Sequence, residues 1–246
     1  MRKLNNPNDF IQIILEAKEL EIDSTSGALL SIPEYEIMPD DFLRFSREGL
    51  LNDNIQSKVN SVSNLKRALD CQLDIFLDSL NLKRIFDRYN LKFEQKTKFL
   101  ADIGILSVES INKLNKIRNK IEHEYKEPKI EDIQLYYDIV WYVVRILALN
   151  IRLINSNGDF GCSIYYNEKV YYFYFEFDVK NNAFKLELRD YSAENKEEKQ
   201  SLIVELKDKS DVELYTKTFV FYLSTIEFFE DFNEKLFLRK ISCIFN

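Results

Sequence analysis

The stretch Val170–Asp190, VYYFYFEFDVKNNAFKLELRD, decides the fold class, because apolar and polar side chains alternate along it. The large apolar side chains at alternate positions are Phe173, Phe175, Phe177 and Val179, followed by Phe184, Leu186 and Leu188. Successive side chains of a strand point to opposite faces, so this alternation predicts two strands with one apolar face each. The intervening Lys180–Asn182 suits a hairpin turn. The stretch therefore predicts antiparallel β structure.

The rest of the second half extends this prediction. SLIVEL (201–206) and ELYTKTFVFYL (213–223) read as further strands, because both are rich in β-branched and aromatic residues. TIEFFEDFNEKLF (225–237) is ambiguous and fits a short helix before a final strand. We expect an antiparallel β or α+β unit whose edges are covered by the first half of the chain or by a partner.

Before residue 155 the apolar residues recur at spacings of three and four, which is typical of amphipathic helices. The expected helices cover 9–20, 39–51, 63–80, 108–125 and 131–150, with a loop over 23–38. Pro39 suits a helix start and Pro128 a helix end. The predicted fold class is α+β in two parts. An N-terminal all-α antiparallel helical bundle covers residues 1–154, and a C-terminal antiparallel β-rich domain covers 155–246.

The composition is that of a globular protein, with 46% hydrophobic and 30% charged residues and a net charge of −7. That charge disfavours a nonspecific nucleic-acid binder, although residues 81–129 hold 12 Lys and Arg against 7 Asp and Glu. The 3 cysteines are far apart, which predicts reduced thiols in a cytoplasmic protein. The longest apolar run, 139–151, is short and contains Arg145, so we expect no membrane span.

Residues 117–125, IRNKIEHEY, contain the only histidine of the chain, His123. On a helix, positions four apart share a face, so Asn119 lies on the side of His123 and Arg118 on the side of Glu122. One interpretation is a solvated helix end, in which Arg118–Glu122 is an i,i+4 ion pair and His123 favours the helix C-terminus. The other interpretation is a site that cuts RNA.

The spacing Arg118, four residues, His123, one residue, Tyr125 resembles the RX4HXY form of the Rx4–6H motif of HEPN domains. HEPN domains are helical-bundle ribonucleases of toxin–antitoxin, phage-defence and CRISPR systems, and the resemblance covers about residues 40–153. It implies a metal-independent endoribonuclease that acts as a homodimer through the motif helix. The RX4HXY form is similar to toxins paired with a minimal nucleotidyltransferase antitoxin. In those toxins the tyrosine, here Tyr125, accepts AMP; packing at a helix end is the other interpretation of Tyr125.

The residue types suit RNA cleavage by the substrate's own 2′-hydroxyl. An imidazole moves protons at neutral pH, so His123 is the predicted general base or acid. A guanidinium binds phosphate oxygens, so Arg118 is the predicted clamp on the transition state, and Asn119 orients the groups. Accessory candidates are Asp70, Lys66 and Glu122, although Lys66 and Asp70 also suit a plain surface pair. We predict neither a metal nor another cofactor, because no His–carboxylate cluster has ligand spacing.

The β-rich half offers an aromatic face, with tyrosines at 165, 166, 172 and 174 that could stack on bases. Its excess of acidic over basic residues argues against that role and favours an interaction or specificity module. Three hypotheses remain open at this point. They are a HEPN-type endoribonuclease in a toxin or phage-defence role, a non-catalytic HEPN-fold module that binds a nucleotide or a protein, and an unrelated helical scaffold.

Overall fold

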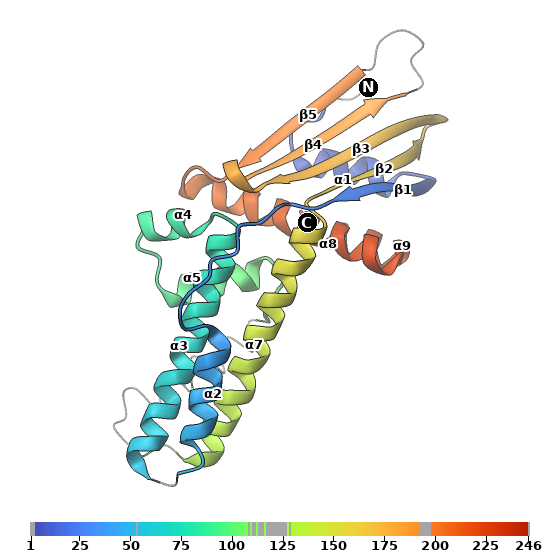
Figure 1. Cartoon of the computed structure of the whole chain (residues 1–246). Coiled ribbons are helices and arrows are strands. Elements are labelled where there is room, and N and C mark those ends of the chain that lie inside the picture. The colour runs from blue at the N-terminus through green and yellow to red at the C-terminus, as the bar shows by residue number, and fades with distance from the viewer. Residues whose placement is uncertain are drawn as a thin grey trace. The chain divides into compact units, whose positions relative to one another are not determined.

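The structure is a computed structural model that describes residues 3–52, 54–107, 109, 112, 116, 127, 129–191 and 198–245. The chain divides into two compact units (Figure 1). The sheet unit consists of Met1–Leu30 and Arg152–Asn246, and the helical unit consists of Ser31–Ile151.

The sheet unit contains a five-stranded antiparallel sheet with the strand order β1-β2-β3-β4-β5. The strands are β1 (Glu19–Ser26), β2 (Asp159–Tyr166), β3 (Lys169–Asp178), β4 (Ala183–Asp190) and β5 (Glu198–Glu205). The predicted hairpin over 170–190 is confirmed, because β3 pairs with β4 around a turn of one 3-10 segment, Val179–Asn181. Asn182 completes this turn at a φ of 51°, a left-handed conformation that asparagine tolerates well.

The pairing of β1 with β2 is the long-range contact of the sheet. Ser26 lies opposite Asp159, so the helical unit is inserted into what is otherwise a β-hairpin. The insertion begins and ends at a tight crossing, where the N–H of Gly158 donates to the carbonyl of Ser26 at 2.5 Å. A Cβ on Gly158 would lie 2.3 Å from the backbone nitrogen of Ala28, so only glycine allows the two chain segments to cross this closely.

One face of the sheet packs on helices. The helices of the sheet unit are α1 (Pro7–Leu15), α8 (Val212–Asp231) and α9 (Glu234–Ile241), and α8 runs along the face of the sheet (Figure 1). The core between α8 and the sheet is aromatic: the ring of Phe175 lies 4.9 Å from that of Phe221, and Phe160 lies 5.2 Å from Phe229. Aromatic pairs in edge-to-face or offset geometry stabilise a core beyond the effect of burying their apolar surface.

The prediction of a strand over 213–223 is wrong, because these residues belong to α8. The segment is rich in Thr, Val, Phe and Tyr, which favour strands in isolation. Within α8 the fully buried Tyr215, Phe219, Tyr222 and Ile226 instead recur at spacings of three and four and face the sheet. Tertiary packing therefore overrides local propensity here.

The helical unit contains α2 (Pro39–Gly49), α3 (Ile55–Ser79), α4 (Lys83–Arg88), α5 (Phe93–Asp102) and most of α7 (Ile130–Ser156). The predicted helices over 39–51, 63–80 and 131–150 are confirmed. α2 and α3 pack closely, since the hydroxyl of Ser61 donates to the carbonyl of Ser46 at 2.9 Å. The core of this unit is mainly aliphatic, with Leu65, Leu69 and Val140 fully buried, and it also contains Phe76 and Tyr136.

The predicted fold class is wrong, because the N-terminal part is not an all-α bundle. The structure is mixed α/β, and β1 at residues 19–26 completes a sheet whose other strands lie in the C-terminal half. α1 is capped by Asn6, not Asp9, and stops at Leu15. The turns after it lead into a strand where helix and loop were expected, because β2 needs a partner at its open edge.

Among the described helices, α7 alone is long and apolar enough to cross a membrane by length and composition. Core helices of soluble proteins share these features. About a third of the residues in the most apolar stretch of α7 are buried, including Val140, Val144 and Leu147. The structure is therefore compatible with a soluble protein.

Candidate functional site

The predicted catalytic segment lies outside the described residues. This applies to Arg118, Asn119, Glu122, His123 and Tyr125, so their predicted roles stay predictions. Three residues of the same predicted helix, Glu109, Asn112 and Lys116, are described, and each is helical and exposed.

The accessory candidates Lys66 and Asp70 both lie on α3, one turn apart and half-buried. They begin a charged row with four-residue spacing that continues through Asp74 and Asp78. The ammonium group of Lys96 on α5 donates to Asp74 at 2.6 Å, which ties α5 to α3. Burial and then the carboxylates Asp78 and Asp74 raise the pKa of the neighbouring Tyr35 hydroxyl. This row therefore contributes to packing between α3 and α5. The hydroxyl of Tyr35 beside it does not ionise near neutral pH.

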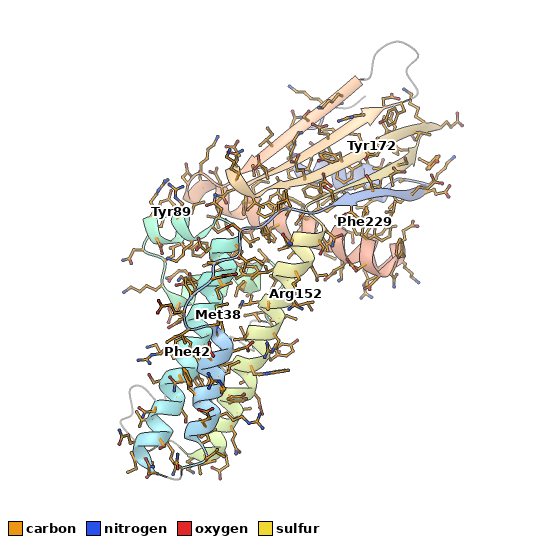
Figure 2. The ribbon with its side chains drawn as sticks, viewed as in Figure 1. Met38, Phe42, Tyr89, Arg152, Tyr172 and Phe229 are labelled. Carbon is orange, nitrogen blue, oxygen red and sulfur yellow. The ribbon has the colours of Figure 1, made fainter. Side chains whose placement is uncertain are left out.

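A cationic cluster lies on the sheet face turned away from α8. The strand register places Tyr172, Arg189 and Lys199 in one row across β3, β4 and β5, and Tyr174, Glu187 and Ser201 in the next row. Lys185 is two residues from Glu187 on β4. We call Tyr172, Tyr174, Lys185, Glu187, Arg189 and Lys199 the basic patch, and Figure 2 shows Tyr172 on the sheet.

Glu187 is the centre of the basic patch and is only 1% exposed. Its carboxylate accepts a hydrogen bond from Arg189 at 2.9 Å and forms ion pairs with Lys199 at 2.8 Å and Lys185 at 3.1 Å. Burial by itself raises the pKa of Glu187, but the hydrogen bonds from Lys199, Arg189 and Lys185 outweigh it and hold the pKa at about 2. One ionised carboxylate thus fixes three cations in place.

Acidic residues occupy the other half of the same face. On β1, Glu21 accepts from the Tyr165 hydroxyl and Asp23 from the Ser163 hydroxyl, both at 2.9 Å. On β2, Asp159 accepts from the Tyr174 hydroxyl at 2.7 Å. The face is therefore divided into an acidic half on β1 and β2 and a basic half on β4 and β5.

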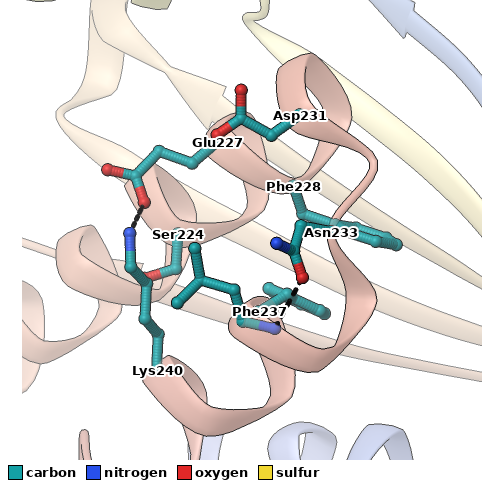
Figure 3. A pocket seen from close by; sticks show the side chains of 8 residues that line it. Ser224, Glu227, Phe228, Asp231, Asn233, Phe237 and Lys240 are labelled. Atoms are coloured by element: carbon teal, nitrogen blue, oxygen red, sulfur yellow. Dashed lines mark hydrogen bonds and ion pairs between the residues drawn. The ribbon is translucent and has the colours of Figure 1, made fainter.

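A shallow hollow between α8 and α9 is lined by eight side chains (Figure 3): Ser224, Glu227, Phe228, Asp231, Asn233, Leu236, Phe237 and Lys240. Its floor is the stacked pair Phe228 and Phe237, with ring centres 4.7 Å apart. Glu227 forms an ion pair with Lys240 across it. The hollow encloses about 190 Å³ including open solvent, less than the roughly 300 Å³ of a small ligand site. The contacts that line the hollow hold α9 against α8. Its lining residues include no pair of groups suited to acid–base or nucleophilic catalysis.

Metal and thiol chemistry find little support in the part of the chain that is described. There, no group of three His, Cys, Asp or Glu side chains can hold a metal ion. Cys162 is buried, and burial raises the pKa of its thiol to about 12, so it stays protonated and unreactive. Burial also raises the pKa of Cys71.

The basic patch is only partly predictable from local sequence patterns. Lys185, Glu187 and Arg189 alternate with buried residues, so their common face is readable from FKLELRD. Lys199 joins them only through the β4–β5 register, which no local pattern specifies. Comparison of the chain with known protein families, with curated proteins and with solved structures finds no match.

Proposed function

We propose that the protein is a metal-independent endoribonuclease of HEPN type, acting in the cytoplasm as a bacterial toxin or phage-defence protein. The observation that carries this proposal is the sequence spacing of Arg118, His123 and Tyr125, in which His123 is the one histidine of the chain. The proposal concerns the motif and its chemistry; the predicted bundle over residues 1–154 is no part of it.

In the proposed reaction the 2′-oxygen of the RNA attacks the adjacent phosphorus. The 2′ O–P bond forms, the P–O5′ bond breaks, and the 5′-oxygen leaves with a proton. His123 takes or gives a proton, Arg118 neutralises the charge on the phosphorane, and Asn119 orients the reacting groups. A single imidazole serves one proton transfer at a time, so we propose a homodimer that brings two motif helices together.

The described residues that precede the motif support a helix in this part of the chain. Glu109 and Lys116 are seven residues apart and both exposed, as expected for one face of a helix. The exposed large apolar residues of α7, Leu135, Trp141, Tyr142 and Leu149, support a subunit interface in this unit.

A non-catalytic binding module is the alternative, and one observation favours it. The basic patch is a built surface with fixed cations and tyrosines, and it contains no group suited to proton transfer at neutral pH. A protein that only binds an anionic partner needs no more than this. A small nucleotidyltransferase antitoxin as the partner of Tyr125 is part of the first proposal and not of the alternative.

The test is RNA cleavage in EDTA by wild type, His123→Ala, Arg118→Ala and Arg118→Lys, with the product ends identified. We expect wild type to leave 2′,3′-cyclic phosphates and both alanine variants to lose at least a hundredfold in rate, since general acid–base catalysis contributes about 10²–10⁴. Arg118→Lys keeps the charge but not the fork, so it recovers only part of the rate. Lys98→Ala on α5, an exposed partner of Asp102, is the matched control.

Two results contradict the proposal. One is a folded wild type that leaves tRNA, rRNA and mRNA intact, which would favour the binding module. The other is cleavage that His123→Ala retains, which would place the chemistry elsewhere. Sedimentation of the same samples tests the homodimer independently, because binding and assembly do not require cleavage.

A further inference from the structure

We propose that the basic patch on β3, β4 and β5 binds a single unpaired RNA strand, with its phosphates at Lys185, Arg189 and Lys199 and its bases against Tyr172 and Tyr191. The identity of the ligand as RNA rests on the proposed function. The existence of an anion-binding surface rests on the geometry of the patch alone.

The first support is the charge that remains after the internal ion pairs are formed. Three cations surround Glu187, whose single negative charge is almost fully removed from solvent. Glu176 offers a second carboxylate, 3.7 Å from Lys185, so these three cations and two carboxylates of the described chain carry a net charge of +1. The side chains of Lys199, Lys185 and Arg189 stay 43%, 39% and 32% exposed. An anion at the surface therefore meets cations that are already fixed in position.

Fixed cations matter because ordering long side chains costs entropy. A free lysine on a surface loses rotamer freedom when it binds a phosphate. Here Glu187 already holds Lys199 and Arg189 at hydrogen-bond distance, so much of that ordering occurs on folding and not on binding. The buried carboxylate is thus best understood as an anchor for the cations.

The second support is the aromatic groups beside these cations. Tyr172 lies in the same cross-strand row as Arg189 and Lys199, and its ring packs edge-on against Tyr191 at 6.0 Å. Tyr191 is 53% exposed. Gly161 on β2 makes room for Tyr172, since a Cβ there would lie 1.9 Å from the tyrosine hydroxyl. The hydroxyl of Tyr172 lies 3.5 Å from that of Ser24, so its ring extends over β2 toward β1, and Tyr191, which follows β4, is the exposed ring on the side of the cations. Aromatic rings on the surface of a sheet can stack on bases.

An unpaired strand fits this surface better than a duplex or an acidic peptide. A duplex hides its bases, and the described face offers no projecting helix to enter a groove. An acidic peptide would use the cations but gain little from the tyrosine rings. The acidic half of the face, with Glu21, Asp23 and Asp159, confines any polyanion to β3, β4 and β5.

The experiment measures binding without cleavage, in a His123→Ala background. Fluorescence anisotropy follows a labelled, unstructured RNA of about 12 nucleotides, within the roughly 4–16 nucleotides that small single-strand sites cover, across a range of KCl concentrations. We expect Lys199→Ala to weaken binding and to reduce the slope of log K against log salt by about 0.7. Tyr191→Ala should weaken binding about fivefold or more and leave the salt slope unchanged, because stacking releases no counterions.

The matched control is Lys217→Ala on α8, on the opposite side of the sheet, where Lys217 pairs with Glu213. It removes one positive charge from the same unit and should leave both affinity and slope unchanged. Thermal melts confirm that each variant is folded. Tyr191→Phe provides a second check, because it keeps the ring and should bind as the parent does.

The proposal is overturned if Lys199→Ala and Tyr191→Ala bind RNA as the parent does. It is also overturned if a duplex of the same sequence binds equally well, or if a poly-glutamate peptide binds through these residues while RNA does not. Failure of the proposed function looks different: wild type then cleaves no RNA, while the patch variants still lose binding. If the patch variants bind RNA as the parent does while wild type still cleaves RNA, the patch proposal alone fails.

Discussion

Ser26 and Asp159 are 133 positions apart in the sequence, yet the hydroxyl of Ser26 donates to the carboxylate of Asp159 at 2.7 Å. They are register partners at the end of the β1–β2 pair, and Asp159 also accepts from Tyr174 on β3. The two ends of the helical unit therefore leave the sheet unit side by side. This geometry resembles a domain inserted at the tip of a hairpin, a position at which proteins tolerate insertion well.

We expect the sheet unit to fold without the helical unit. Leu30 and Asn155 are already in contact, since the N–H of Leu30 donates to the Asn155 side chain at 2.8 Å. A chain in which a short Gly/Ser linker joins Leu30 to Arg152 should therefore unfold cooperatively, measured by circular dichroism in urea. An unfolded product would contradict the independence of the unit.

Tyr222→Phe should destabilise the protein by about 1–2 kcal/mol. The buried hydroxyl of Tyr222 donates to the carbonyl of Asn157 at 2.5 Å and lies 3.2 Å from that of Gly158. Its removal takes this donor from the Asn157 carbonyl, whereas the Gly158 carbonyl still accepts from the N–H of Phe177 at 2.9 Å. Tyr215→Phe on the same helix is the matched control. The hydroxyl of Tyr215 is buried and finds no hydrogen-bond partner among the described residues, so its removal should be neutral or stabilising. Equal losses in urea unfolding would refute the distinction.

Gly158→Ala should destabilise the β1–β2 end by about 1–3 kcal/mol, the usual range for overpacking. Its new Cβ would lie 2.3 Å from both the backbone nitrogen and the Cα of Ala28, and neither atom can rotate away. Ala28→Gly in the same chain should not rescue it, because those two atoms remain. Rescue in a thermal melt would show that the clash involves only the side chain of Ala28.

The ion pairs of Glu187 should make stability depend on pH in a defined window. The pKa of Glu187 is about 2 in the folded protein against an ordinary value of 4.5, so its stabilisation is complete above pH 4.5 and is lost as the pH falls toward 2. We expect Glu187→Gln to be less stable than the parent by on the order of 3 kcal/mol above pH 5, with the difference vanishing near pH 2.

The control for this prediction is Glu213→Gln, which breaks an exposed i,i+4 pair with Lys217 on α8. Such surface pairs contribute about 0.2–1 kcal/mol, so its effect should be small at every pH. Urea unfolding at a series of pH values measures both variants. A Glu187→Gln deficit as large at pH 2 as at pH 6 would mean that packing, and not charge, is responsible.

Local patterns predicted the elements whose period is clear and whose partners are near in the chain. The β3–β4 hairpin is one example, because alternation over 170–190 and the turn at Lys180–Asn182 both lie within one short stretch. α3 is another, since Leu65, Leu69, Leu73 and Phe76 carry the helical period. Helices and hairpins of this kind are stabilised by contacts close in sequence.

The errors arose where a distant partner decides the conformation. ELEIDSTS becomes β1 only because the edge of β2 is open to it, and β2 begins at Asp159. α8 is a helix because the aromatic face of the sheet accepts Phe219 and Tyr222 at helical spacing, against their preference for strands. The gathering of Lys199 around Glu187 likewise depends on strand register. The catalytic motif itself stays a prediction from sequence.

The insertion between β1 and β2 also sets an order of events during synthesis. At about 5–20 residues per second, the ribosome needs on the order of ten seconds between completing Ser26 and delivering Asp159. During that interval β1 is a strand without its neighbour, open to mispairing with other nascent chains. Its last residues, Asp23, Ser24, Thr25 and Ser26, are polar and exposed, which is the composition that discourages such pairing. The polar end of β1 therefore limits mispairing until β2 has been synthesised.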